Sequence, residues 1–441
     1  MKNLGMRCPS MMQMLKQNAA PVFRGVCIGG CLMFFASLAC TSIDVIKCAG
    51  IGKPRVIIDT DLGSSMDDLF TIDLAARMHW AGQLDLMAVM MNRPDCSAPE
   101  GEGEFLKFAD RYLASLGFGD LPLGTSAPLA EERLPQQVFD PYWTLIYSNN
   151  MTGVGALMPA NRTDAQLASL TNAVALYRRL LNDASDKSVV ICSIGFLNNL
   201  KALMESGANH DGDGIASTGL ELISAKVKEL RIMGGCFDPA SAPDGTNGAE
   251  YNVAGDPVAA KRVFEEWPSP VIASPWEVGL KLDYKSADVL ADFPVGTPDP
   301  VLRAACMYWS EPAQDDMDRL WDPVTVLPLT EGDALVPLSE KGGISVDENG
   351  ITAFTPNASG NRCHQVSSNM NATAVMNRVR AICRTGNAFG TSKTSGTSGT
   401  SDAAPSPTDP AVSAETPSAP SGELTKKGCF KAGRHSLDGS K

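Results

Sequence analysis

Short segments that are hydrophobic at every position constrain the fold of this chain more than any other feature. Residues 56–58 read V-I-I and residues 189–192 read V-V-I-C. A strand with one face in water alternates hydrophobic and polar side chains, whereas a strand covered on both faces does not. These segments therefore predict a sheet with helices on both sides. We expect strands at residues 55–59, 84–91, 188–194, 229–233 and 271–274.

Longer segments with helical periodicity lie between the predicted strands. We expect helices at residues 68–80, 104–116, 171–182 and 257–266. Strands that alternate with helices along a chain are typical of α/β folds, because each helix returns the chain across a parallel sheet. The sequence therefore predicts an α/β fold with a mostly parallel central sheet and flanking helices, in a single domain.

The two ends of the chain differ in composition from its middle. Basic residues at positions 2, 7, 16 and 24 precede fourteen hydrophobic or small residues, 26–39. That length is short for a membrane span and suits the core of a secretory signal, so we expect export or secretion. We assign residues 1–50 to a signal peptide or membrane anchor region and residues 53–385 to a single folded domain. Residues 386–441, rich in Ser, Thr, Gly and Pro, are predicted to be a disordered tail.

Charge and composition narrow the class of ligand. Thirty-seven basic residues against fifty acidic ones give a net charge of −13, which argues against nucleic acid as a partner. The twelve cysteines form no pattern typical of a zinc site. With four histidines in the chain, the chemistry is expected to depend on carboxylates.

Acidic and amide residues follow several of the predicted strands. Asp59 and Asp61 end the first strand, Asp67 and Asp68 come shortly after, and Asn92 follows the second strand. The carboxyl ends of parallel strands meet at one edge of a sheet, where such folds bind ligands. Each feature also has a simpler reading, since Asp67 and Asp68 would suit the start of a helix and Asn92 would suit a turn. Their common position at one edge favours a binding site.

The motifs, taken in order, resemble the nucleoside hydrolase family. The segment D-T-D-L-G-S-S-M-D-D, residues 59–68, is similar to the family's Asp-x-Asp-x-Gly signature followed by Asp-Asp. Further similar segments follow in the family's order: L-M-A-V-M-M-N, L-P-L-G-T-S-A-P-L, S-I-G-F-L-N-N-L, I-M-G-G with A-E-Y-N-V-A-G-D-P-V-A-A, W-E-V-G and W-D-P-V-T-V-L. They span residues 55–330. The resemblance implies a Rossmann-like nucleoside hydrolase fold.

The resemblance also implies a calcium ion and a set of site residues. Its ligands would be Asp61, Asp68, the main-chain carbonyl of Asn198, and Asp322. Clustered carboxylates are tolerated around such a cation, which takes six to eight oxygen ligands. Asp61 would accept a proton from the water that attacks the ribose. The ribose hydroxyls would be bound by Asp67, Asn92, Asn247, Glu250 and Asn252.

The implied reaction is the hydrolysis of the N-glycosidic bond of ribonucleosides to free base and ribose. Many members carry a histidine before the last aspartate, thought to protonate the leaving base, and this chain has Trp321 there. The indole of tryptophan is too weak an acid to protonate a leaving base, although its ring could stack on the base. The partner is therefore expected to be a small nucleoside. Relatives in the family are often homo-oligomers.

Two other functions remain open from the sequence. Asp59-Thr60-Asp61 after a hydrophobic strand also resembles the nucleophile motif of haloacid dehalogenase-type phosphohydrolases, which use Mg²⁺, but Gly63 stands where that family has Thr or Val. The presence of Trp321 keeps open a non-catalytic, exported protein that binds ribose or nucleosides on the same fold.

Overall fold

The computed structural model of the protein describes residues 52–62, 66–93, 102–130, 158, 160–243, 246–293, 299 and 317–384. The predicted signal or anchor region and the predicted tail lie outside these residues, as does the hydrophobic run 26–39. No helix in the described part of the chain has the length and hydrophobicity needed to cross a membrane.

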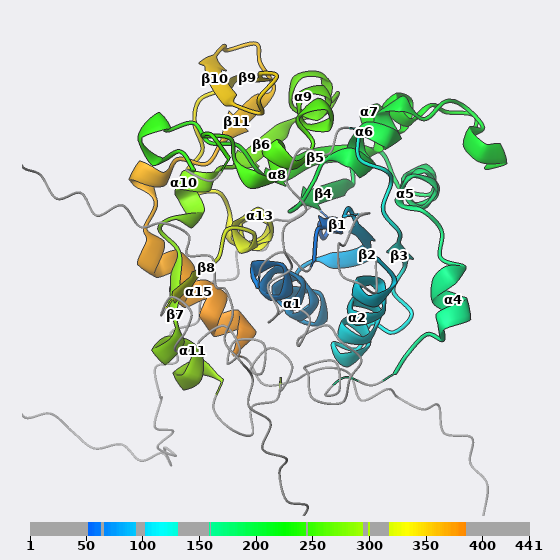
Figure 1. The fold of residues 1–441 in the computed structure, drawn as a ribbon, viewed down its shortest axis with the longest axis horizontal. Coiled ribbons are helices and arrows are strands. Elements are labelled where there is room, and N and C mark those ends of the chain that lie inside the picture. Colours follow the sequence, from blue (N-terminus) through cyan, green and yellow to red (C-terminus); the bar gives the residue numbers. More distant parts are fainter. Residues whose placement is uncertain are drawn as a thin grey trace, which may run out of the picture.

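One large sheet forms the centre of the molecule (Figure 1). Its strands are β1 (Arg55–Thr60), β2 (Asp85–Met91), β3 (Leu123–Gly124), β4 (Val189–Ser193), β5 (Val227–Met233), β6 (Val271–Ser274), β9 (Gly342–Val346), β10 (Thr352–Pro356) and β11 (Arg362–His364). They lie in the order β10-β9-β11-β6-β5-β4-β1-β2-β3. All pairings from β11 to β3 are parallel, and β9 is antiparallel to β10 and β11. A separate antiparallel pair joins β7 (Asp283–Lys285) to β8 (Met317–Arg319).

The strand order changes direction beside β1. The chain runs from β1 outward through β2 and β3, then returns to the other side of β1 and runs outward through β4, β5 and β6. At such a switch point the connections leave neighbouring strands in opposite directions, which opens a crevice at their carboxyl ends. Asp59 and Asp61 at the end of β1, and Asn198 after β4, are therefore placed at this crevice.

Helices cover both faces of the sheet. The helices of the described residues are α1 (Asp67–Trp80), α2 (Glu102–Ser115), α4 (Asp164–Ala168), α5 (Ala173–Asn182), α6 (Asn198–Glu205), α7 (Gly219–Lys226), α8 (Tyr251–Gly255), α9 (Pro257–Glu266), α10 (Trp276–Gly279), α11 (Ser286–Asp292), α13 (Pro323–Val326), α14 (Pro328–Glu331) and α15 (Ala372–Cys383). Three short 3₁₀ helices are η2 (His210–Gly212), η3 (Pro239–Ser241) and η4 (Ser367–Asn369).

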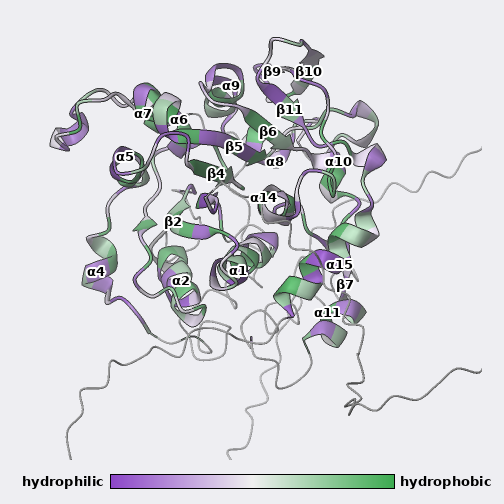
Figure 2. Cartoon of the chain, turned by 180° about the vertical axis from the view of Figure 1, so that it is seen from behind, coloured by the Kyte–Doolittle hydropathy of each residue, from purple (hydrophilic) through white to green (hydrophobic). Residues whose placement is uncertain are grey.

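Each face of the sheet has its own hydrophobic core. Val56 and Ile58 of β1 point into a core shared with α1, α2, α13 and α15. Ile57 points into the opposite core, with α5, α6, α7 and α9. Figure 2 shows the hydrophobic colouring of β4, which is buried along its length. Burying a side chain of this size contributes about 1.5–3 kcal/mol, so two-sided burial fixes the central strands.

The α/β fold with a mostly parallel sheet is confirmed, with small differences at element ends. The helix predicted at 171–182 begins at Ala173, because the side chain of Asn172 accepts a hydrogen bond from the N–H of Ala175 at 2.9 Å and caps the helix. Strands β9, β10 and β11 were not predicted. In β9 the residues alternate between buried and exposed over five positions, a pattern too short to stand out.

Candidate active site

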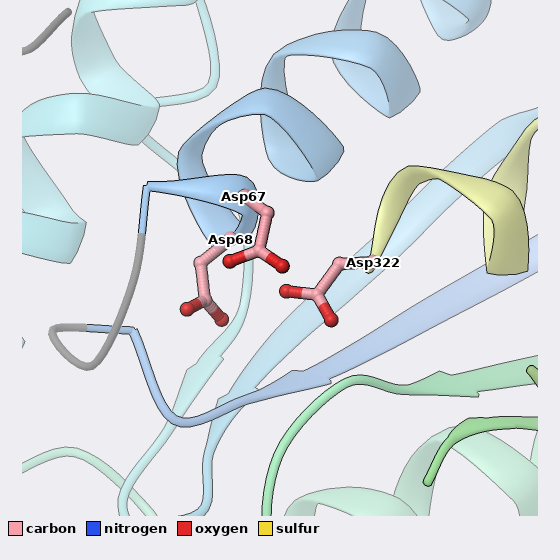
Figure 3. Close-up of side chains that lie close together, drawn as sticks. All are labelled: Asp67, Asp68 and Asp322. Carbon is pink, nitrogen blue, oxygen red and sulfur yellow. The ribbon is translucent and has the colours of Figure 1, made fainter. Parts of the chain in front are cut away.

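Three buried aspartates meet at the carboxyl edge of β1. One carboxylate oxygen from each of Asp67, Asp68 and Asp322 lies within 4.8 Å of the other two. Asp67 and Asp68 occupy the first turn of α1, whereas Asp322 precedes α13, far along the chain. Figure 3 shows the carboxylates of Asp67 and Asp322 directed toward each other, with Asp68 beside them. We call these three residues the carboxylate cluster.

Neighbouring groups fix the orientation of the carboxylate cluster. The hydroxyl of Thr60, the last residue of β1, donates a hydrogen bond to Oδ1 of Asp68. The main-chain N–H of Trp321 donates to Oδ2 of Asp67 at 3.1 Å. The N-cap of α1 is Met66, whose side chain makes no capping hydrogen bond, and Asp67 and Asp68 lie in the first turn, as the simpler reading of a helix start predicted. Their position in the first turn still benefits from the positive end of the helix dipole.

Burial and mutual repulsion oppose ionisation in the carboxylate cluster. Burial, followed by the charges of Asp61 and Asp67, raises the pKa of Asp68 well above its usual value. Burial, followed by the charges of Asp67 and Asp68, does the same for the pKa of Asp322. The charge of Arg93 lowers the pKa of Asp68, but it is outweighed. A divalent cation would relieve this repulsion, and a set of carboxylate oxygens suits a hard ion such as Ca²⁺ or Mg²⁺.

Asp61 lies beside the carboxylate cluster but is not one of its three members. It is buried, and its charge raises the pKa of Asp68, Asp322 and Glu250. A Cβ atom added at Gly195 would lie 2.6 Å from Oδ1 of Asp61 and 2.5 Å from Oδ1 of Asn92. Only glycine therefore allows the turn after β4 to approach both side chains this closely.

Asn198 begins α6 at the same edge of the sheet. Its side-chain Nδ2 donates to the carbonyl of Ala127 at 2.5 Å and to Oγ of Ser126 at 3.2 Å. Its Oδ1 is buried and makes no hydrogen bond within the described residues. The structure thus places all four predicted metal ligands at the switch point, while the mutually close trio contains Asp67 in place of Asp61.

The residues predicted to bind ribose fall into two groups. Asn92, Glu250 and Asn252 are buried near the carboxyl ends of β2, β4 and β5. Nδ2 of Asn252 donates to the carbonyl of Met233 at 3.2 Å, which ties it to the end of β5. Asn247, by contrast, is exposed in a turn before α8, with a left-handed φ of 54°.

Glu250 is the N-cap of α8, and the protein already binds its carboxylate. Its oxygens accept hydrogen bonds from the N–H groups of Asn252 at 3.0 Å, Gly235 at 3.2 Å and Val253 at 3.3 Å. Burial nevertheless raises its pKa to about 7, because it outweighs these three stabilising contacts. Glu250 is therefore rigidly held and titrates near neutral pH.

A buried network around Asp59 was not predicted from the sequence. Its carboxylate accepts hydrogen bonds from Nδ2 of Asn92 at 2.6 Å, the hydroxyl of Tyr177 at 2.7 Å and Nδ2 of Asn199 at 3.2 Å. Oδ1 of Asn92 accepts from the N–H of Phe196 at 3.2 Å. An acceptor on one side and a donor on the other fix the amide of Asn92 in one orientation. The position of Asp59 at the end of a predicted strand indicated a polar site there. Nothing in the sequence of the helix that contains Tyr177 indicated that its hydroxyl would bind Asp59.

This arrangement combines the parts needed for metal-assisted attack by water. The carboxylate cluster offers oxygen ligands, Asp61 is a further carboxylate beside it, and Asn92, Glu250 and Asn252 offer groups that can bind hydroxyls. Among the described residues, no other group of three or more His, Cys, Asp or Glu side chains is arranged to hold a metal ion.

Comparisons with known proteins identify the family and the fold of the chain. A family model described as inosine-uridine preferring nucleoside hydrolase matches residues 56–381. No curated protein sequence matches the chain significantly. The match argues against the haloacid dehalogenase-type alternative.

Solved structures of low sequence identity share the fold. A plant nucleoside hydrolase has a TM-score of 0.56 at 19% identity, covering 75% of this chain and 98% of its own. The inosine-uridine preferring nucleoside hydrolase from Bacillus anthracis has a TM-score of 0.56 at 17% identity, covering 75% and 99%. The type III effector protein XopQ, solved with adenosine diphosphate ribose, has a TM-score of 0.53 at 16% identity, covering 75% and 94%.

Proposed function

The chain belongs to the inosine-uridine preferring nucleoside hydrolase family, and on that premise we propose that it hydrolyses the N-glycosidic bond of ribonucleosides in a calcium-dependent reaction. The products would be a free base and ribose. The observation that supports this proposal most strongly is the carboxylate cluster, in which Asp322 meets Asp67 and Asp68 across the switch point. Three buried carboxylates without a bound cation repel one another, and that cost is expected where a metal is to be bound.

The ion would be held by oxygen atoms from separate parts of the chain. We assign Asp61, Asp68, Asp322 and the main-chain carbonyl of Asn198 as its ligands, and Asp67 borders the same space. When bound, the ion supplies Lewis-acid activation of water at neutral pH. The chain itself supplies the dry, preorganised surroundings, since all of these side chains are buried.

Asp61 would act as the general base. Its carboxylate accepts a proton from the attacking water, whose oxygen forms a bond to the anomeric carbon of the ribose. The bond between that carbon and the base nitrogen breaks, and its electron pair leaves with the base, which then takes up a proton. The transition state resembles an oxocarbenium ion, so the negative charge of the surrounding carboxylates stabilises it.

The ribose hydroxyls would be bound by Asp67, Asn92, Glu250 and Asn252, with Asn247 contributing from its turn. The network around Asp59 supports this role, because it holds the amide of Asn92 in one orientation. A deoxyribose lacks a hydroxyl and would leave some of these buried groups unpaired. We therefore expect ribonucleosides to be preferred strongly over deoxyribonucleosides.

The leaving base would meet Trp321 instead of an imidazole. Because an indole does not donate a proton at neutral pH, Trp321 would contribute by stacking on the base. The same residue favours a second candidate function, a protein that binds nucleosides without cleaving them.

Purified protein incubated with inosine and uridine distinguishes the two functions. Release of free ribose that stops with EDTA and returns with Ca²⁺ is the expected result. Asp61→Asn should abolish release, and Asp347→Asn, a change in an exposed turn, serves as the matched control. Binding of inosine without ribose release would support the binding protein instead.

We also propose that the protein is exported, through the hydrophobic run at residues 26–39 acting as a signal or an anchor. Sequencing the N-terminus of the mature protein tests this, because cleavage near Ala39 is expected and an intact N-terminus in the membrane fraction would indicate an anchor. Association into a homo-oligomer is a further proposal, to be tested by light scattering.

A further inference from the structure

Two tryptophans stack beside the carboxylate cluster. The indole rings of Trp276 and Trp321 lie with their centroids 4.9 Å apart and their planes 17° from parallel. Both side chains are partly exposed, although the aspartates next to them are buried. Trp321 also packs against the core beside α1, and its partial exposure leaves part of its surface accessible at the edge of a polar site.

Trp321 is attached directly to the carboxylate cluster. Its main-chain N–H donates to Oδ2 of Asp67 at 3.1 Å, and the next residue is Asp322. Its indole Nε1 donates to the main-chain carbonyl of Trp276 at 3.1 Å, so the one polar atom of the ring is bound by α10. Gly279, also in α10, lies against the five-membered part of the same ring, where a side chain would overlap it.

Trp276 is itself held by main-chain groups from another part of the site. Its indole Nε1 donates to the carbonyl of Ser241 at 2.8 Å, and its N–H donates to the carbonyl of Gly235 at 2.8 Å. The N–H of Gly235 in turn binds Glu250 at 3.2 Å. The Trp276 ring is thus fixed to the segment after β5 that also carries a proposed ribose ligand.

We propose that Trp276 is a specificity-determining residue that acts through Trp321. Trp276 covers one face of the Trp321 ring and sets its tilt, so that a base can stack only on the part that Trp276 and Gly279 leave free. A purine presents a larger ring surface than a pyrimidine, and it gains more from a rigid, correctly tilted ring. Trp276 therefore sets how strongly the site prefers purine over pyrimidine ribosides. This inference rests on the proposed function.

Three variants test the inference. Trp276→Leu keeps a hydrophobic side chain but removes the flat surface, and Trp276→Phe restores a smaller one. Gly279→Ala keeps the Trp276 side chain but places a methyl group against the Trp321 ring, so the packing of Trp321 against α10 must change. Trp80→Leu, a partly exposed tryptophan at the far end of α1, is the matched control.

The measured quantity is the ratio of kcat/KM for inosine to kcat/KM for uridine. We expect Trp276→Leu and Gly279→Ala to lower this ratio about tenfold, with most of the ratio restored in Trp276→Phe and none lost in Trp80→Leu. The calcium-dependent rise in Tm should persist in all four variants, since none removes a carboxylate. An unchanged ratio in folded Trp276→Leu would overturn the inference.

Binding of free hypoxanthine and free uracil, measured by calorimetry, separates this inference from the proposed function. If the wild-type protein binds hypoxanthine but releases no ribose, the proposal that it is a hydrolase fails. The effect of Trp276 on base binding can still be measured in that case. Weaker binding of hypoxanthine by Trp276→Leu, about tenfold in Kd, would support the inference in that case. Equal binding by wild type and variant would overturn it.

Discussion

Buried acids in the first turn of the α1 helix and in its middle have opposite surroundings. In its first turn, Asp67 and Asp68 face a third carboxylate, that of Asp322. Two turns later, Asp73 binds Arg77 at 2.7 Å, and the same guanidinium binds Asp299 at 3.3 Å. Both groups are buried, and each contains at least one acid of α1. They differ in where the compensating positive charge comes from.

This difference separates the Asp73 group from the proposed metal site. Around Asp73 the positive charge comes from Arg77, which binds Asp73 in α1 and Asp299 in another segment. These acids therefore need no metal ion to compensate their charge. In the carboxylate cluster burial, followed by repulsion among the aspartates, raises the pKa values of Asp68 and Asp322, and at Asp68 these effects outweigh the charge of Arg93. A raised pKa does not by itself mark an active site, because burial, helped by the nearby Asp299, also raises the pKa of Asp73 to about 7 although Arg77 lowers it.

The largest expected effect is on activity. Asp322→Asn removes a proposed metal ligand and should lower ribose release from inosine about a thousandfold. Asp73→Asn is the control, because it makes the same substitution at another buried aspartate. It should change the rate of ribose release less than about threefold, since Asp73 binds Arg77 and not the substrate. Rates at saturating Ca²⁺ measure both. More than a tenth of wild-type activity in Asp322→Asn would contradict the assignment.

The second effect is on folding. Arg77→Met leaves Asp73 and Asp299 buried without their shared guanidinium, and it should lower the free energy of unfolding by about 3–5 kcal/mol. The control is Arg55→Met at a partly exposed pair, Arg55 and Asp85 at 3.6 Å, where the loss should stay below about 1 kcal/mol. Urea denaturation measures both, and similar losses would show that burial of the Asp73 group is unimportant.

The third effect is the response to calcium. Binding to the carboxylate cluster should raise the free energy of unfolding by about 2.7 kcal/mol when free Ca²⁺ is a hundredfold above its Kd. Thermal melting with and without EDTA detects the shift. It should vanish in Asp322→Asn and persist in Asp73→Asn, and its loss in the latter would show that the two groups are not independent.

The smallest effect is on the pH dependence of stability. The pKa of Asp73 is raised from 3.8 to about 7 by burial, so the folded protein binds its proton more tightly than the unfolded chain does. Its stabilising contribution is complete below pH 3.8 and is lost as the pH rises through about 7. At saturating Ca²⁺, Asp73→Asn should therefore flatten the decline of Tm across this range. An equal decline in both proteins would refute the role of Asp73.

Much of the site was visible in the sequence because its residues follow strands. Because β1 and β4 are buried on both faces, their sequences are hydrophobic throughout and predict strands. Asp61 and Asn92 directly follow the ends of β1 and β2, and Asp67 begins the next helix. Asp68 and Asp322, two of the predicted metal ligands, lie close together in the structure, and the third carboxylate beside them is that of Asp67, which was predicted to bind ribose. The roles of these residues stay predictions. The network of Tyr177, Asn199 and Asp59 was not visible, since hydrogen bonds between distant segments leave no periodic pattern.

The sequence by itself determined the α/β class and the polar residues at the strand ends, because burial on two faces and the alternation of strands and helices are local properties of the chain. Tertiary structure decided which carboxylates meet. Asp67 and not Asp61 completes the mutually close trio, Asp73 acquires a basic partner, and Trp276 stacks on Trp321. Each of these depends on the distance between atoms from separate elements, and electrostatic and stacking energies change steeply with that distance.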